Sequence, residues 1–115
     1  MNEQSINEQI QSVEVSMDHA KEAVEKSKSI ARLVKNRDFK KIILDGYFEQ
    51  EAIRLVTLKA DAGFQTSEDQ ASILKQMDGI GSLRVYLNTV NQLGAMSARA
   101  LEEDEETLAE LRAEE

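Results

Sequence analysis

The chain has 115 residues, of which 41% are hydrophobic and only 4% aromatic, and its formal net charge at pH 7 is −8. Cysteine and proline are both absent. The missing cysteines exclude disulfides, thiolate nucleophiles and cysteine-ligated zinc, and the few aromatic side chains argue against a large ring-lined ligand pocket. The length and the lack of helix breakers predict a single domain of the all-α class.

The first predicted helix spans residues 5–34 and carries the most regular apolar pattern of the chain. Nine positions recur at alternating steps of four and three, and this period of 3.5 residues is typical of a coiled-coil-like seam. Such a helix needs a partner helix, from the same chain or from another one, to cover the seam. A capping-box pattern, Ser5 with Glu8, precedes it. The seam positions are Ile6, Ile10, Val13, Met17, Ala20, Val24, Ser27, Ala31 and Val34.

The second predicted helix spans residues 39–60 and is apolar around much of its circumference, which favours contacts on more than one side. Gly46 lies inside it, where glycine lowers helix propensity, so we expect close packing or a kink at this point. Asp38 is the expected N-cap, and Gly63 is the expected left-handed residue after the helix.

The third predicted helix spans residues 67–101, with a capping box formed by Ser67 and Gln70. Gly79 and Gly81 mark a place where this helix could bend. Its apolar face consists of Ile73, Met77, Ile80, Leu83, Leu87, Val90, Gly94, Ala98 and Leu101. The three helices predict a single domain over residues 1–101, built as an elongated antiparallel hairpin or three-helix bundle.

Charge is strongly polarised along the chain. Residues 26–41 hold seven basic side chains against one acid, a net +6, whereas residues 102–115 hold eight acids against one arginine, a net −7. We interpret 102–115 as an acidic C-terminal extension that either continues the helix through Leu108 and Leu111 or frays, and that folding does not require. The basic stretch resembles no helix-turn-helix or zinc knuckle, so we expect it to dock on an acidic protein surface, or to pair with the acidic tail of a neighbouring copy, rather than to bind nucleic acid.

The candidate interaction residues combine the seam with the basic stretch: Ile6, Ile10, Val13, Met17, Val24, Val34, Lys35, Arg37, Lys40 and Lys41. Catalytic residues, metal ligands and cofactor-binding residues are not expected. His19, the one histidine, falls off the seam without a positioned partner, and Glu49 and Glu51 fall on different faces of an α-helix. Nor does any apolar run reach the ~20 residues of a membrane span, so no membrane partner is expected.

Three segments together resemble small acidic helical proteins encoded among the head, portal and packaging genes of tailed bacteriophages. They are NRDFKKIILDGYFEQEAIRLVTLK at 36–59, QMDGIGSLRVYLNTV at 76–90 and ALEEDEETLAELRAEE at 100–115. The resemblance covers roughly residues 30–115 and rests on overall texture rather than on a catalytic motif. It implies a virion component, assembled in the host cytoplasm, that takes part in head assembly. The acidic C-terminus departs from scaffolding proteins, in which a basic coat-binding segment is expected.

The resulting hypothesis is a non-enzymatic structural or assembly protein of a tailed-phage virion. It would dock its helical seams onto copies of itself or onto a larger virion protein, such as portal or coat. Two alternatives stay open at the level of sequence. One is a nucleic-acid-associated regulator that uses the basic residues 26–41, and the other is a cytosolic helical adaptor or inhibitor with an acidic tail.

Overall fold

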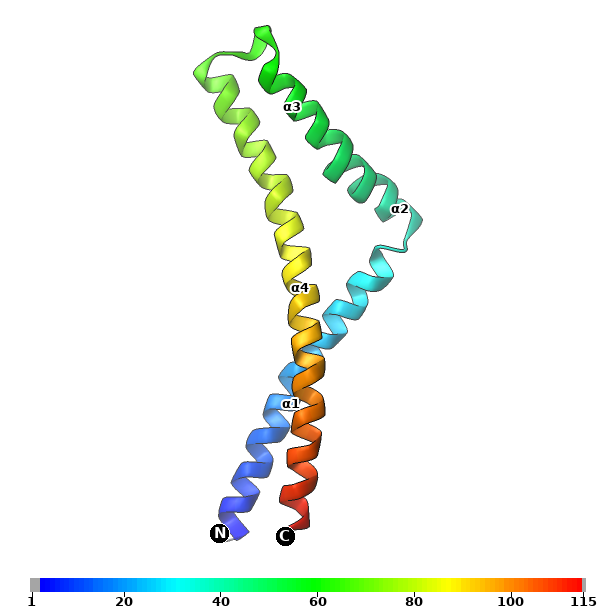
Figure 1. The fold of residues 1–115 in the computed structure, drawn as a ribbon, viewed down its shortest axis with the longest axis vertical. Helices are drawn as coiled ribbons and strands as arrows, with labels where there is room; N and C mark the ends of the chain where they lie inside the picture. Colours follow the sequence, from blue (N-terminus) through cyan, green and yellow to red (C-terminus); the bar gives the residue numbers. More distant parts are fainter. Residues whose placement is uncertain (1–2, 115) are drawn as a thin grey trace. The chain divides into compact units, whose positions relative to one another are not determined.

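The computed structural model describes residues 3–114 and confirms the all-α class, since no strand occurs among these residues. Helix α1 spans Glu3–Leu33, and a second helical segment consists of α2 (Arg37–Phe39), the π-helix η1 (Lys40–Glu51) and α3 (Ala52–Ala60) in direct succession. A 3-10 turn, η2 (Ala62–Phe64), leads into α4, which spans Ser67–Ala113. Figure 1 shows these elements in chain order.

Contacts within the chain divide it into two compact units. Unit 1 contains Met1–Ser29 and Val90–Glu115, and unit 2 contains Ile30–Thr89. Helices α1 and α4 each contribute residues to both. The acidic stretch 102–115, expected as an extension appended to a single domain over 1–101, falls within unit 1, where Leu108 shares a core with α1.

In unit 1, α1 and the second half of α4 pack antiparallel, so that the start of α1 lies beside the end of α4 (Figure 1). The buried core consists of Ile6, Ile10, Met17 and Leu108, with Val13, Leu101 and Leu111 packed against it. Two polar contacts join the helices at their margin. Arg112 pairs with the Glu14 carboxylate at 3.1 Å, and the Ser16 hydroxyl donates to the Asp104 carboxylate, also at 3.1 Å.

In unit 2, the segment η1–α3 pairs with the first half of α4 as a helical hairpin (Figure 1). Its core is built from Leu55, Ile73 and Ile80, and Leu55 is completely buried. Tyr47, Phe48, Ala52, Leu58 and Met77 pack around these three side chains. The Arg84 guanidinium lies 5.8 Å from the centre of the Phe48 ring, a distance typical of a cation–π contact.

The helix ends differ from the expected caps. Asn36, not Asp38, caps the second helical segment, because its side-chain oxygen accepts a hydrogen bond from the Phe39 amide at 2.9 Å. Thr66, not Ser67, caps α4 in the same way, with its hydroxyl accepting from the Asp69 amide at 3.1 Å. At the N-terminus, Ser5 lies inside α1 rather than before it.

The connection between α3 and α4 uses glutamine amides where a left-handed glycine was expected. Gly63 has no positive φ and lies in η2, with its amide donating to the Asp61 carboxylate at 2.7 Å. The Gln70 side chain donates to the carbonyls of Lys59 and Phe64, so it is not the end of a capping box with Ser67. Gln65 also donates to Lys59, at 3.0 Å. These amides satisfy carbonyls that the end of a helix leaves without partners.

Helix α4 runs without interruption through the two glycines at which a bend was expected, Gly79 and Gly81. The helix also continues past Leu101 to Ala113, so the acidic stretch extends the helix instead of fraying. Leu108, at 8% exposure, belongs to the unit 1 core. Removal of residues 102–115 would therefore uncover Ile6, Ile10 and Met17, so the structure predicts, unlike the sequence, that this segment contributes to stability.

Candidate docking surfaces

The seam of α1 is covered from within the chain. Ile6, Ile10, Met17 and Ala20 are buried, and Val13 and Val24 are half-buried. The regular spacing holds as far as Ser27, which is half-buried as well. Beyond that point the spacing fails, since Ile30 is buried instead of Ala31, and Val34 lies exposed after the end of the helix.

The two helices of unit 1 approach each other closely at Gly94. A Cβ atom added to Gly94 would collide with both Cβ and Oγ of Ser27, and it would lie 3.4 Å from the backbone oxygen of Ala23. The Ser27 hydroxyl turns back along its own helix and donates to the Val24 carbonyl at 2.8 Å. Small side chains at such a crossing allow backbones to come together, so Gly94 is fixed by packing rather than by backbone conformation.

The buried face of α4 differs in one position from the predicted face. Ser97 is half-buried, whereas Ala98 is exposed. With Ser97 in place, the alternating steps of three and four continue from Ile80 through Leu101, Asp104 and Leu108 to Leu111. The face of α4 that packs against α1 therefore has a heptad pattern of its own. The predicted face does not show this pattern, because it contains Ala98 instead of Ser97.

Unit 2 contains an open apolar groove of about 430 Å³ between η1–α3 and α4. It is lined by Ile42, Ile43, Gly46, Tyr47, Glu51, Leu55, Gln76 and Gly79. Two of the lining residues, Gly46 and Gly79, have no side chain. A Cβ atom added to Gly79 would lie 3.4 Å from the Tyr47 hydroxyl. An apolar lining with a few polar groups is the composition typical of binding sites.

The π-helix η1 brings the lining residues of this groove to one face. Ile42 and Glu51 are nine positions apart, which is two and a half turns of an α-helix and would place them on opposite sides. Hydrogen bonds in a π-helix run over five residues instead of four, so residues that share a face lie further apart in sequence. Gly46 shows this geometry, since an added Cβ would lie 3.1 Å from the carbonyl oxygen of Lys41, five residues earlier. The expected tight packing at Gly46 thus comes from its own helix.

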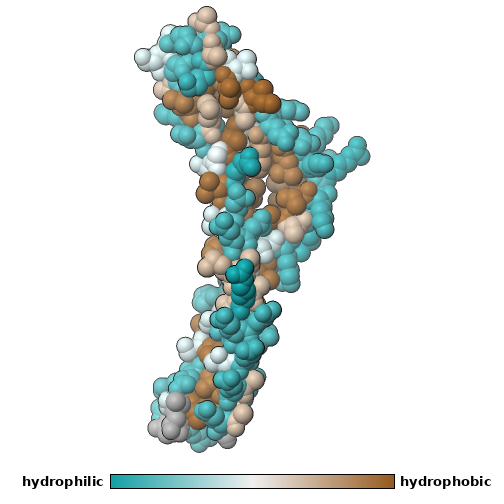
Figure 2. All heavy atoms as spheres, viewed as in Figure 1, coloured by the Kyte–Doolittle hydropathy of each residue, from teal (hydrophilic) through white to brown (hydrophobic). Residues whose placement is uncertain are grey.

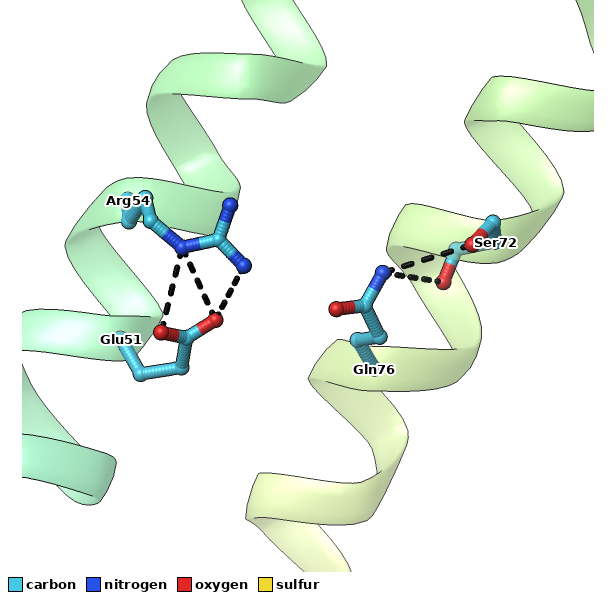
Figure 3. Close-up of polar contacts among 4 residues, drawn as sticks. All are labelled: Glu51, Arg54, Ser72 and Gln76. Atoms are coloured by element: carbon cyan, nitrogen blue, oxygen red, sulfur yellow. Dashed lines mark hydrogen bonds and ion pairs between the residues drawn. The ribbon is translucent and has the colours of Figure 1, made fainter.

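A polar rim lies along the groove between α3 and α4 (Figure 3). Arg54 Nε donates to both carboxylate oxygens of Glu51, at 3.0 and 3.1 Å, and its Nη2 also contacts Oε1. These hydrogen bonds lower the pKa of Glu51 and raise that of Arg54 from their ordinary values. On α4, the Gln76 amide donates to the hydroxyl and the carbonyl oxygen of Ser72, both at 3.3 Å.

Several large apolar side chains stay exposed on the helices. In unit 2, Ile42, Ile53, Val56 and Val85 are each more than half exposed, and Figure 2 shows apolar surface along the helices of this unit. In unit 1 the most exposed large apolar side chain is Met96, at 62%, and Leu93, one turn earlier on α4, is 50% exposed. Sequence reasoning expected contacts on more than one side of the second helix, but it missed Val85, Leu93 and Met96 because it searched for one buried face on the third.

The basic candidate residues all lie on the surface. Lys35 sits in the turn after α1, Arg37 begins α2, and Lys40 and Lys41 begin η1, directly before Ile42 of the groove. All four are exposed. The structure thus separates the predicted site residues into two groups, because the seam residues Ile6 to Val24 lie on the covered face of α1, whereas Val34 and the basic residues face solvent.

Residues 3–114 hold neither a metal-binding cluster nor a membrane-spanning helix. No three His, Asp or Glu side chains in this range gather closely enough to hold a metal ion. His19 is exposed on α1. None of the described helices combines the length and the hydropathy needed to cross a membrane.

Comparisons with known proteins add no relatives to this picture. No protein-family model, no curated protein sequence and no solved structure matches the chain.

Proposed function

We propose that this chain is a non-enzymatic structural or assembly protein that works by docking its helix surfaces onto other protein chains. The observation that supports this most directly is the set of large apolar side chains left exposed on the paired helices, above all Ile42, Ile53 and Met96, each more than 60% exposed. Contiguous exposed apolar surface marks contact sites for other proteins, and Ile42 belongs to the lining of the apolar groove of unit 2. The α1 seam has a structural role instead, because α4 already covers it.

The setting that we propose for this docking is the head of a tailed bacteriophage, with the same chain or a larger protein such as portal or coat as the partner. This part of the proposal rests on the resemblance of segments 36–59, 76–90 and 100–115 described above. The exposed Lys40 and Lys41 beside the apolar groove fit an acidic protein surface.

Mass spectrometry of purified virions tests the proposal. We expect peptides of this chain at a constant ratio to the head proteins, through successive rounds of density-gradient purification. As a control, an abundant host protein of similar size should decline from round to round. A chain that disappears together with the host control, and that is absent from assembly intermediates as well, would contradict a role in the virion.

A nucleic-acid-associated regulator is the second candidate, favoured by the exposure of the basic residues. Clustered lysine and arginine side chains bind phosphates in a strongly salt-dependent way. The test is retardation of duplex DNA at about 50 mM salt, where phosphate contacts are strong. Retardation abolished by the combined Lys35, Arg37, Lys40 and Lys41→Glu variant would favour this candidate over protein docking.

A further inference from the structure

The groove of unit 2 changes character along its length. Its inner part is apolar, with Ile42, Ile43 and Leu55 around the two glycines. At the Ile42 end, the preceding residues Lys40 and Lys41 are exposed and positive, and Arg37 stands one turn earlier. A fitting occupant therefore carries small or flexible apolar side chains followed by acidic ones on the same face.

The second half of α4 has such a face. Leu93 and Met96 are exposed, and the same face continues with Ala100, Glu103 and Glu110, because the steps of three, four, three and seven keep these positions together on an α-helix. It is distinct from the face that packs on α1, which carries Gly94, Leu101 and Leu108. One face of this helix segment thus runs from apolar to acidic, while the groove runs from apolar to basic.

We infer that the groove of unit 2 binds the Leu93–Glu110 face of a second copy of this chain. Leu93 and Met96 enter the apolar part beside Ile42 and Ile43, and Glu103, about 10 Å further along its helix, lies near Lys40 and Lys41. Glu110, about 20 Å beyond Met96, lies past them on the side of Arg37. Binding is favourable for both copies, because apolar side chains that face water in the single chain become buried in the contact. The charge order fixes the direction in which the helix enters, because the reverse direction would leave both the acidic and the basic side chains opposite apolar surface.

This inference deepens the proposed function and rests on it, since self-docking is one form of helix docking. A flexible methionine at the contact suits an irregular groove between a π-helix and an α-helix. The groove is lined without side chains at Gly46 and Gly79, where an added Cβ would already touch Lys41 and Tyr47, so the apolar contacts to the incoming helix come from Ile42 and Ile43.

The test uses the absence of cysteine in the natural chain, which lets one introduced cysteine report on one position. One copy carries Ile42→Cys, and a second copy, enlarged by a tag, carries Met96→Cys. Both positions are exposed, so the fold tolerates the changes, as circular dichroism verifies. A disulfide needs Cα atoms within about 7 Å, so mild oxidation gives the mixed product only where the groove holds the second copy. The matched control replaces Met96→Cys with Val15→Cys, which is 53% exposed on α1.

We expect the mixed 42–96 product to exceed the mixed 42–15 product several-fold. Lys40→Glu with Lys41→Glu in the groove copy should reduce it, and Glu103→Lys with Glu110→Lys in the other copy should restore it. Lys26→Glu with Lys28→Glu, the same change of charge elsewhere, should leave it unchanged. Equal yields for the 42–96 and 42–15 pairs would overturn the inference, even if virions contain the chain. Conversely, a specific 42–96 product together with virions that lack the chain would refute the proposed phage-head setting alone.

Discussion

In unit 1, two α-helices meet along regular heptad positions and close together at a single glycine, whereas in unit 2 a π-helix lies against an α-helix and leaves an open groove. Both units bury a few large aliphatic side chains, and both use the same long helix α4. The two units differ in the helix that packs against α4, which is the α-helix α1 in unit 1 and the π-helix η1 with α3 in unit 2. A regular period lets two faces interlock along their length, while the π-helix spreads its apolar side chains beyond the contact and leaves some of them free for a partner.

The largest effect that separates the two units is expected from Leu55→Ala. Leu55 is completely buried at the centre of unit 2, so truncation removes its packing and leaves a cavity, at a cost of about 2–5 kcal/mol in the free energy of unfolding. Hydrogen exchange should show lost protection in residues 30–89. The matched control on the same helix is Ile53→Ala, which is 67% exposed and should change stability little. Equal losses for both variants would contradict the assignment of Leu55 as the core of unit 2.

Leu108→Ala makes the corresponding change in unit 1. Leu108 covers Ile6, Ile10 and Met17, and its truncation should cost about 2–5 kcal/mol, near the lower end because the side chain keeps 8% exposure. Chemical denaturation measures the loss, and Leu93→Ala, at a half-exposed position of the same helix, is the control. Deletion of 102–115 should be at least as damaging. A truncated chain with an unchanged melting temperature would show that the acidic stretch is dispensable after all.

A smaller effect is expected at the glycine crossing of unit 1. Gly94→Ala forces the new Cβ against Ser27, and overpacking of this kind costs about 1–3 kcal/mol. The same change at Gly81, where the added Cβ would meet no atom within 4 Å beyond its own stretch of helix, should instead stabilise the helix by up to about 1 kcal/mol.

A double variant sharpens the measurement at this crossing. Ser27→Gly removes both atoms that the new Cβ would meet, so Gly94→Ala combined with Ser27→Gly should lose less stability than the sum of the two single changes. Thermal unfolding of the four proteins gives the coupling free energy. Strict additivity would mean that the helices separate at Gly94 in solution.

The smallest effect concerns the ion pair at the rim of the unit 2 groove. Because Arg54 lowers the pKa of Glu51, the ionised carboxyl is favoured in the folded state, and its contribution to stability is present above the ordinary value of about 4.5. It is lost as the pH falls through the lowered value. Glu51→Gln should therefore flatten the acid dependence of the melting temperature slightly, while Glu49→Gln should not. Identical acid profiles for the wild-type chain and Glu51→Gln would contradict the pair.

Much of unit 1 could be predicted from sequence, and much of unit 2 could not. The spacing from Ile6 to Ser27 identified the buried face of α1 because a heptad pattern depends only on a regular α-helical period. The same reasoning could not find the groove, since an α-helical period places Ile42 and Glu51 on opposite faces. A π-helix carries no comparable signal in the sequence, and its presence is decided by tertiary packing.

The missed glycine has a similar cause. Gly46 stood out because its neighbours are large and apolar, while Gly94 looked like one more small member of a regular face. Which of them closes a helix crossing depends on the opposite helix, and only the pairing with Ser27 reveals it. Leu108 was undervalued for another reason, because the acids around it suggested a solvated end. Acidic residues on the outer side of a helix do not prevent burial of its inner side.

The two units also differ in how much chain separates their paired helices, and this has a consequence for how the protein folds. Gln65 and Gln70 help to close the short connection between α3 and α4, whereas the contacts of Ser16 with Asp104 and of Glu14 with Arg112 join positions 88 and 98 residues apart. Local pairing closes a small loop and forms early, while distant pairing waits. During synthesis, the hairpin of unit 2 can form while α1 has no partner, since Leu108 follows the whole hairpin in the chain. Ile6, Ile10 and Met17 stay uncovered during that interval, and neighbouring nascent chains on one message can then exchange their α1 helices.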